Sequence, residues 1–491
     1  MKVLFFYKYN YIEPIGLMYL SSALKLAGHE TFFYDILLDG DVCGFVGRLR
    51  PEIIAYSIVT GTHHQYARLN RRLKERFSFF AVFGGPHATF FPDFINEPGV
   101  DAVCIGEGED ALAELATGLE RNQDITGIAN MWVKLGDTIF KNDVRPLDRN
   151  IDRLAFPDRA LVYSYDAYRK RSNKYVTSSR GCPYNCTYCF NHSLKKLYRG
   201  KGLFCRKRSI GNVIGELEGL KRAASVKRVQ FFDDVFILDR QWVLDFCKEY
   251  RERIALPFIC YARVNLLDEE IVAALKSAGV VTITFAIETG SSHLRNQVLK
   301  RRISERSILK AAELMHRYTI NFFTQNMVGL PGETVADALR TVTLNARCRP
   351  SYANASLFQP YPGLELTDYA VSRGYYRRDH EIVHDSFYKT SVLDLESKRE
   401  LTNLARLFSL AAAWPRMLPL IRLLIKLPGG PLFSAVWHIT RGYGYLFRIK
   451  WIDTADVFSP YAERLMRRLR ACRHSKPGRR MPCRTQRKED S

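Results

Sequence analysis

The feature that most restricts the fold of this chain is an alternation of strand-like and helix-like segments, which occurs in two separate runs. In the first run, residues 1–140, helical periodicity is expected over 16–27 and 65–76. The apolar strands between these helices are expected over 2–7, 29–35, 53–58, 79–83 and 102–105. This alternation predicts a doubly wound, Rossmann-like α/β domain with a parallel sheet.

The second run, residues 173–375, has the same character. Its strands are expected over 175–177, 228–232, 258–262, 282–288, 322–328 and 355–359. Its helices are expected over 210–224, 241–252, 268–278, 305–316 and 335–348. Successive strand–helix units predict a partial (β/α)6 barrel with its chemistry at the carboxyl ends of the strands. A charged linker with Pro146 and Pro157 is expected over 141–172, and a mainly helical region over 376–491.

A cysteine loop opens the predicted barrel, because Cys182, Cys186 and Cys189 follow its first strand in a C-x₃-C-x₂-C pattern. Three thiolates on one tight loop can hold three irons of a 4Fe–4S cluster. Purely structural clusters usually have four cysteines, so a free fourth iron indicates chemistry. Two alternatives stay open at this point. They are a Cys₃His zinc site that uses His192 and a set of buried, idle cysteines.

The cysteine loop resembles that of the radical SAM superfamily, whose pattern places an aromatic residue, here Tyr188, before the last cysteine. The resemblance implies that the open iron binds S-adenosylmethionine (SAM). It also implies that one electron from the cluster cleaves the SAM sulfonium and releases a 5′-deoxyadenosyl radical.

Polar residues stand at the ends of the predicted barrel strands, where core packing would favour apolar ones. They are Asp233, Asp234, Arg263, Glu288, Gly329 and Pro331. A sulfonium amino acid needs such groups, because its ammonium and ribose hydroxyls bind carboxylates and its own carboxylate binds a cation. Each residue also has a simpler interpretation: Asp234 could cap a helix, and Arg263 could pair with Glu269.

The strand ends of the first run carry small residues instead. They are Gly16, Ser57, Gly84, Gly85 and Gly106, with Glu107 beside the last. Glycines let a large planar ligand approach the backbone, so these positions predict a nucleotide-like cofactor. The alternative is that the glycines serve only as turns.

This layout resembles the cobalamin-binding domain, which has a D-x-H-x-x-G motif, then S-x-L, then G-G. Gly16 takes the place of the glycine, Ser57 follows 41 positions later, and Gly84 follows Ser57 after 27 more. The Asp and His of the family motif correspond to Tyr11 and Glu13. The resemblance therefore implies bound cobalamin without a lower axial histidine from the protein.

Over residues 1–375 the chain resembles the fused cobalamin–radical SAM family, through strings such as Ala286–Gly290 and Pro360–Leu366. Carried over by position, Asp233 or Asp234, Arg263 and Glu288 are expected to contact SAM, and Gly329–Gly332 to line the adenine side. The implied activity is methyl transfer from methylcobalamin to an unactivated carbon. Some members perform cyclisation or ring rearrangement instead. A hypothesis from another class is an Fe–S protein that binds RNA or lipid surfaces.

Composition restricts the partners. The net charge is +22, and residues 463–491 hold eleven Lys/Arg against three Asp/Glu, as expected of a basic, solvated terminus. The scattered cysteines favour a reducing cytoplasm. The expected partners are a small-molecule substrate, with hydrophobic molecules among the candidates, and a reductant such as flavodoxin or ferredoxin. DNA is not expected, and peripheral membrane contact is left open by the apolar but charged stretch 404–427.

Overall fold

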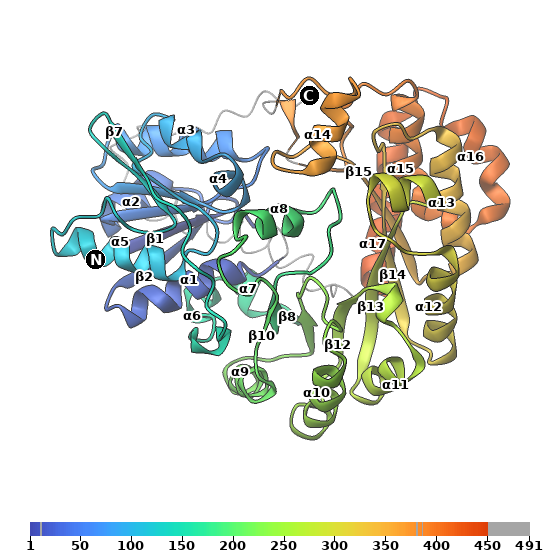
Figure 1. Ribbon diagram of the computed structural model, residues 1–491, viewed down its shortest axis with the longest axis horizontal. Coiled ribbons are helices and arrows are strands. Elements are labelled where there is room, and N and C mark those ends of the chain that lie inside the picture. The colour runs from blue at the N-terminus through green and yellow to red at the C-terminus, as the bar shows by residue number, and fades with distance from the viewer. Residues whose placement is uncertain (10–11, 380–381, 385, 450–491) are drawn as a thin grey trace, which may run out of the picture. The chain divides into compact units, whose positions relative to one another are not determined.

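The computed structural model describes residues 1–9, 12–379, 382–384 and 386–449, which form two compact units (Figure 1). Within these residues, the first unit comprises 1–144 and 155–171, and the second comprises 145–154 and 172–449. The predicted linker is therefore shared between the two units. Tyr11 and the basic tail, about which the sequence made predictions, lie outside the described residues, and the four predicted segment boundaries stay predictions.

The first unit is a seven-stranded sheet in the order β2-β1-β3-β4-β5-β6-β7. Its strands are β1 (Lys2–Tyr7), β2 (Glu30–Asp35), β3 (Ile53–Ser57), β4 (Phe80–Gly84), β5 (Ala102–Cys104), β6 (Met131–Leu135) and β7 (Thr138–Lys141). Its helices are α1 (Ile15–Leu26), α2 (Val42–Leu49), α3 (His63–Lys74), α4 (Pro86–Phe90), α5 (Glu109–Glu120), α6 (Ala160–Tyr163) and α7 (Asp166–Arg169). The strands β1–β5 are parallel, which confirms the predicted doubly wound fold.

The strand order of this sheet reverses at β1, which lies between β2 and β3. In β1, the side chains of Val3 to Phe6 are fully buried, as expected for a parallel strand that is covered on both faces. Ligands of such sheets bind beyond the carboxyl ends of the strands at this reversal. The antiparallel strands β6 and β7 were not expected from the sequence, and β7 is a largely exposed edge strand.

The second unit is built on a six-stranded parallel sheet in the order β8-β11-β12-β13-β14-β15. Its strands are β8 (Asn173–Val176), β11 (Arg228–Phe231), β12 (Phe258–Ala262), β13 (Val280–Glu288), β14 (Asn321–Val328) and β15 (Tyr352–Leu357), with a small pair β9 (Ser179–Arg180) and β10 (Arg206–Lys207). The helices are α8 (Phe190–Leu197), α9 (Ile210–Ala223), α10 (Arg240–Arg253), α11 (Glu269–Ser277), α12 (Glu305–Arg317) and α13 (Val335–Cys348). The predicted partial barrel is confirmed.

Five barrel helices begin at residues that suit a helix start. The side-chain oxygens of their N-cap residues accept hydrogen bonds from backbone N–H groups in the first turn. These caps are Ser209, Asp239, Asp268, Ser304 and Thr334. Such caps satisfy donors that a helix cannot satisfy itself, and they explain why the sequence located these helices to within one or two residues.

The two faces of the barrel strands differ in chemistry. Val229, Phe231 and Cys260 belong to the apolar core that also contains residues of α9–α12. Because successive strand residues point to opposite faces, Gln230, Tyr261, Thr284 and Asn354 face the lumen. A TIM-barrel lumen is normally filled by branched apolar side chains, so this polar lining is unusual.

The C-terminal region is helical, as predicted, and contains α14 (Glu365–Ser372), α15 (Lys398–Ala413), α16 (Leu418–Leu424) and α17 (Gly430–Tyr443). Ser409 of α15 donates a hydrogen bond to the carbonyl of Ala353 in β15 at 2.7 Å. Tyr445 and Ile449 lie against Phe323 and Tyr352, near the amino ends of β14 and β15. Within the described ranges, no helix has the length and apolarity that a membrane span needs.

Candidate functional site

The cysteine loop begins directly after β9, which pairs with β10 in antiparallel fashion. Gly181 has φ +86°, and a Cβ atom there would lie 2.4 Å from the carbonyl oxygen of Phe204. Only glycine fits both the left-handed backbone and this close approach. The tight turn thus places Cys182 at the start of a loop that ends at Cys189, the residue that caps α8.

The three cysteines are free thiols, of which Cys186 is buried and the other two are half-buried. Burial raises the pKa of Cys182 to about 12 and that of Cys189 to about 11. At neutral pH such thiols ionise only when a metal supplies positive charge, which is the situation of a cluster ligand. Donors lie near two sulfurs, with Arg263 Nη1 3.9 Å from Cys186 Sγ and Asn191 Nδ2 3.9 Å from Cys189 Sγ. The three cysteine thiols, with these hydrogen-bond donors near their sulfurs, therefore fit a 4Fe–4S cluster.

The zinc alternative fits less well. No three His, Cys, Asp or Glu side chains converge on one metal ion among the residues that the structure describes. Thiolates that bind three different irons of a cluster do not need to converge in this way. The Nε2 of His192, the proposed fourth zinc ligand, lies 2.9 Å from Glu365 Oε2, and its Nδ1 is buried without a hydrogen-bond partner.

Asp233 and Asp234 have different roles, a distinction the sequence left open. The carboxylate of Asp233 is buried and accepts hydrogen bonds from the Ser178 backbone N–H at 3.0 Å, the Ser178 hydroxyl at 2.8 Å and the Ser179 hydroxyl. Asp234 is exposed and accepts a hydrogen bond from Asn191 Nδ2 at 2.6 Å. Asp233 thus anchors the start of the cysteine loop, whereas Asp234 is accessible to a ligand.

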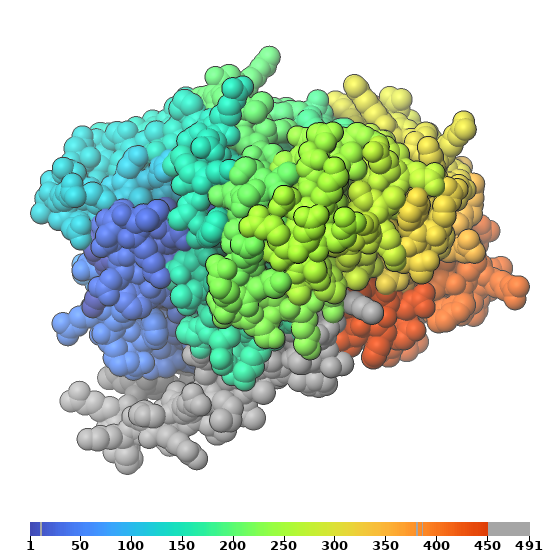
Figure 2. All heavy atoms as spheres, turned by 90° about the horizontal axis from the view of Figure 1, so that it is seen from below, coloured from blue at the N-terminus to red at the C-terminus, as the bar shows by residue number. Residues whose placement is uncertain are grey.

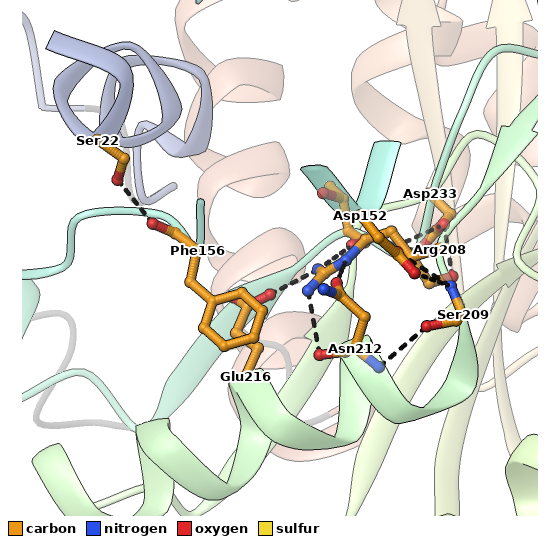
Figure 3. Close-up of polar contacts among 10 residues, drawn as sticks. Ser22, Asp152, Phe156, Arg208, Ser209, Asn212, Glu216 and Asp233 are labelled. Atoms are coloured by element: carbon orange, nitrogen blue, oxygen red, sulfur yellow. Dashed lines mark hydrogen bonds and ion pairs between the residues drawn. The ribbon is translucent and has the colours of Figure 1, made fainter. Parts of the chain in front are cut away.

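Arg208 holds the same loop from its other side (Figure 3). Its guanidinium donates to the Thr177 carbonyl at 2.8 Å, to Asn212 Oδ1 at 2.6 Å and to Glu216 Oε2 at 2.5 Å. Arg208 and Glu216 are both almost completely buried, so each neutralises the charge of the other away from water. Together with Asp233, this pair fixes the backbone between β8 and the cysteines.

Tyr188 links the cysteine loop to β13. Its hydroxyl donates to Glu288 Oε1 at 2.9 Å and also accepts from Arg301 Nη1. Glu288 is buried, so desolvation raises its pKa, while the nearby Arg301 acts in the opposite direction. The backbone of Glu288 has φ +65°, a strained conformation for a residue with a side chain that is typical of functional positions. Arg301 was missed in the sequence, because only the fold brings it to Glu288.

Arg263 lies beside the cluster loop, with its guanidinium carbon 3.7 Å from the centroid of the Tyr184 ring. It also donates to the Arg301 carbonyl oxygen. The alternative partner Glu269 is 3.0 Å from Arg317 instead, so that pairing was wrong. The Nε of Arg263 is buried without a hydrogen-bond partner.

The loop after β14 is shaped by its own glutamate. Glu333 Oε2 accepts from the backbone N–H groups of Gly329 at 2.6 Å and Leu330 at 3.2 Å, which holds Pro331 in a tight turn. Burial raises the pKa of Glu333 to about 8. Gly329 and Gly332 have φ of +75° and +78°, which explains the two glycines of this loop.

In the first unit, the predicted cofactor residues follow the carboxyl ends of β3, β4 and β5 or open α1. Gly85 has φ +94°, and a Cβ there would be 2.8 Å from the Ile58 carbonyl oxygen and 3.1 Å from the Ser57 hydroxyl. Its neighbour Gly84 ends β4. The backbone N–H of Gly106, beside Glu107, donates to Thr89 Oγ1 at 3.1 Å.

Gly16 has a different environment, because a Cβ there would meet nothing within 4 Å. Open space at this point suits a ligand that covers the start of α1, whereas Gly85 is required by the fold itself. The prediction that glycines admit a large ligand is therefore most pertinent at Gly16.

Glu13 occupies the position of the family's axial histidine, and its carboxylate is buried. Arg159 Nη1 lies 2.7 Å from Glu13 Oε2, and the Tyr163 hydroxyl lies 3.1 Å from Glu13 Oε1. The side chain is therefore held by α6 and its N-cap residue, Arg159.

Three histidines that the sequence did not single out gather beyond β3 and β4. The rings of His63 and His87 stack with centroids 3.9 Å apart, and the rings of His63 and His64 are 3.7 Å apart. His63 Nδ1 accepts from the Gly61 N–H at 3.2 Å, so in the neutral ring the proton is on Nε2. This tautomer leaves His63 without a free lone pair for a metal.

Comparison with known proteins agrees with this geometry. Residues 176–344 match the radical SAM superfamily, and residues 1–116 match the B12 binding domain. An uncharacterized methyltransferase of Pyrococcus horikoshii is 28% identical over 371 residues, which cover 73% of this chain and 78% of the relative. An anaerobic magnesium-protoporphyrin IX monomethyl ester cyclase of Rubrivivax gelatinosus is 25% identical, and the match covers 72% of this chain but only 65% of the cyclase.

A solved structure has the same fold. It is the radical S-adenosylmethionine methyltransferase TsrM of Kitasatospora setae with cobalamin and a [4Fe-4S] cluster bound. The TM-score is 0.66 at 17% identity, and the match covers 96% of this chain and 99% of that chain.

Residues 176–344 form a domain of the radical SAM superfamily. The chain is a cobalamin-dependent radical SAM enzyme, because a B12 binding domain precedes the barrel. The predicted cofactors, a 4Fe–4S cluster, SAM and cobalamin, are confirmed at this level. The individual residues that hold them, and the lack of an axial histidine, stay predictions.

Replacing Cys186 by Ala is expected to abolish both the cluster and the reductive cleavage of SAM, because two remaining thiolates cannot hold three irons. Iron content, the EPR spectrum of the reduced protein and release of 5′-deoxyadenosine measure these effects. Cys205→Ala is the matched control, since Cys205 is a half-buried free thiol near the loop and should be dispensable. Cleavage retained by Cys186→Ala with a reconstituted cluster would refute the assignment.

Asp233→Asn is expected to lower the free energy of unfolding by about 1–3 kcal/mol, because an amide nitrogen would face the Ser178 N–H. Asp234→Asn should leave the melting temperature unchanged and weaken SAM binding, since an exposed charged acceptor is lost. Thermal unfolding and equilibrium dialysis with labelled SAM separate the two. Equal melting temperatures for both variants would show that Asp233 is not the anchor.

Bound cob(II)alamin is expected to show no nitrogen superhyperfine splitting from a protein histidine, because Glu13 is held by Arg159 and Tyr163. EPR of protein grown with ¹⁵N-histidine distinguishes a protein nitrogen from the cofactor's own base. A splitting that changes with this label contradicts the prediction. Its loss in His63→Gln, His64→Gln or His87→Gln would then identify the ligand.

Proposed function

We propose that this protein is a methyltransferase that transfers a methyl group to an unactivated carbon of a small molecule bound in the barrel lumen. The observation that carries the proposal is the polar lining of the lumen next to the cysteine loop. Methyl transfer is favoured over cyclisation because the P. horikoshii relative, whose name is that of a methyltransferase, is covered over more of its length than the cyclase.

The residues present fit the cofactors. Cys182, Cys186 and Cys189 would hold the cluster, Asp234 and Glu288 would bind SAM, and the Gly16 edge of the first sheet would receive cobalamin. When bound, these groups supply a substrate radical and a methyl donor. The protein supplies binding, orientation and exclusion of water and oxygen.

The task of the buried Tyr188–Glu288–Arg301 cluster is orientation. Arg301 donates to Glu288 Oε1 at 3.3 Å and to the Ala286 carbonyl at 2.7 Å. These bonds keep the Glu288 carboxylate rigid and next to the residue before the last cysteine. A carboxylate in that position can hold ribose hydroxyls close to the cluster loop without rearrangement.

The lumen would recognise a neutral polar group of the substrate. The side chain of Gln230 is fully buried beside the Tyr261 hydroxyl, with which it interacts, and its amide oxygen is buried without a hydrogen-bond partner. Thr284 Oγ1 and Asn354 Oδ1 are likewise buried without a partner. Such groups cost free energy unless a ligand or water satisfies them. Donors and acceptors without a net charge suit an amide or hydroxyl, and the rest of the substrate can be hydrophobic.

The setting of the reaction follows from the same chemistry. An oxygen-sensitive cluster and free cysteines favour a reducing compartment such as the cytoplasm. The electrons would come from a small reductant such as flavodoxin or ferredoxin. Two rivals keep the cluster: a cyclase or ring-rearranging enzyme with the same cofactors, and an Fe–S protein that senses rather than catalyses.

One product assay separates these functions. Reconstituted protein, reductant and SAM with a deuterated methyl group are incubated with polar and hydrophobic metabolite extracts. A methyltransferase releases S-adenosylhomocysteine and 5′-deoxyadenosine together, and one metabolite gains the labelled methyl. Release of 5′-deoxyadenosine alone with a competent extract would indicate cyclisation or rearrangement. No SAM cleavage by reduced protein would favour sensing, and Cys186→Ala gives the background.

Gln230→Leu is expected to reduce the labelled product about tenfold or more while SAM cleavage without substrate continues, because a leucine cannot pair with a polar substrate group. The ratio of methylated product to 5′-deoxyadenosine is the measurement. Leu238→Ala at the end of the same strand–loop segment controls for a general perturbation. An unchanged ratio in Gln230→Leu would show that the substrate does not bind in this part of the lumen.

A further inference from the structure

The C-terminal helices lie in a stretch of the chain that has no acidic residue. Between Glu400 and Asp453 there is no Asp or Glu, and up to Ile449 the stretch carries six cations. They are Arg406, Arg416, Arg422, Lys426, Arg441 and Arg448. Mixed charges are the rule on protein surfaces, so a surface of one sign indicates a partner of the opposite sign.

Large apolar side chains on these helices are exposed. Leu423 on α16 is 65% exposed, and Ile439 on α17 is 71% exposed. Leu432, Ile439, Tyr443 and Phe447 recur at spacings of seven, four and four residues, which places them along one stripe of α17 and its extension. The apolar side chains that α16, α17 and the loop between them bury are Ile421, Ile425, Phe433 and Trp437. The exposed stripe therefore does not contribute to the packing of these helices.

A cavity of about 510 Å³ lies between α15 and the loop that joins α16 to α17. Its lining includes Lys398, Arg399, Thr402, Asn403, Arg406 and Gly430. Arg406 donates to the Lys389 carbonyl at 2.9 Å, but its Nε is buried without a hydrogen-bond partner. None of Lys398, Arg399 and Arg406 forms an ion pair with any residue in the described part of the chain. Three cations without a carboxylate partner suit an oxyanion such as a phosphate.

The cavity and the apolar surface are adjacent. Asn403, which lines the cavity, donates to the carbonyls of Ile425 and Leu427, and Leu427 is itself 51% exposed. Both α16 and α17 contact α15, so one helix supports the two features. In the space-filling view, the orange and red surface of these helices lies at the outer edge of the second unit, beside the yellow helices (Figure 2).

We propose that α16 and α17 form a docking surface for an anionic membrane, in which the cavity at Arg406 binds a lipid phosphate and the exposed stripe enters the headgroup region. Apolar side chains flanked only by cations are the pattern of a helix that lies in the membrane interface. Neither α16 nor α17 contains an acidic residue that would pair with a cationic rim on a protein partner. The docking does not rest on the proposed methyl transfer, although it would give the enzyme access to hydrophobic substrates.

The test is co-sedimentation of the full chain with phosphatidylcholine vesicles, with and without phosphatidylglycerol, at low and high NaCl. Binding is expected only with phosphatidylglycerol and should weaken as salt rises. Two variants should each lose about tenfold or more of the vesicle affinity. They are Leu423→Ser/Leu432→Ser/Ile439→Ser and Arg399→Gln/Arg406→Gln. The matched controls are Leu26→Ser/Leu135→Ser/Leu203→Ser and Arg306→Gln/Lys310→Gln, which remove exposed residues elsewhere.

Several outcomes would overturn the proposal. Unchanged binding of the serine variant would assign the affinity to charge elsewhere, such as the basic tail. A dimer in sedimentation velocity that the serine variant abolishes, without vesicle binding, would assign the stripe to a second copy. If the protein binds inorganic phosphate but does not bind vesicles, the cavity is a site for a free anion. Near-UV circular dichroism and iron content show that each variant is folded, and SAM cleavage is read separately.

Discussion

The buried carboxylate of Asp233 is the contact on which the second unit's site depends. It accepts hydrogen bonds from Ser178 and Ser179, which lie between the first barrel strand and the cysteines. Arg208 holds the same backbone from the other side. A cluster loop needs its three thiols in fixed places before any iron binds, and a flexible loop of this length would have to be ordered at the cost of entropy.

A second link runs from the loop to the strand that carries Glu288. The Tyr188 hydroxyl lies between Glu288 and Arg301, so an aromatic residue that is part of the cysteine motif also positions a cofactor-facing carboxylate. The strained backbone at Glu288 is tolerated because Arg301 and the bulge in β13 hold it on two sides. In the barrel lumen, Thr284 Oγ1 and Asn354 Oδ1 are buried polar atoms that the fold leaves without a hydrogen-bond partner.

Most of the fold could be predicted because it depends on local patterns. A run of apolar residues indicates a buried strand such as 258–262. A capping side chain indicates the start of a helix such as Val335–Cys348. The antiparallel edge of the first sheet was missed, because β7 is short and exposed and has little apolar signal. The cysteine loop was found for the same local reason: its three ligands and its glycine lie within nine residues.

The sequence by itself determined the class of enzyme, since ligand spacing and strand–helix alternation are properties of neighbouring residues. Only the tertiary structure decided which carboxylate anchors and which is accessible, because Asp233 and Asp234 are adjacent in sequence and differ only in what surrounds them. It also brought Arg301 to Glu288, His63 to His87, and Arg159 to Glu13 across 146 positions. Buried charges and orphan polar groups arise from contacts between distant segments, and those contacts exist only once the chain has folded.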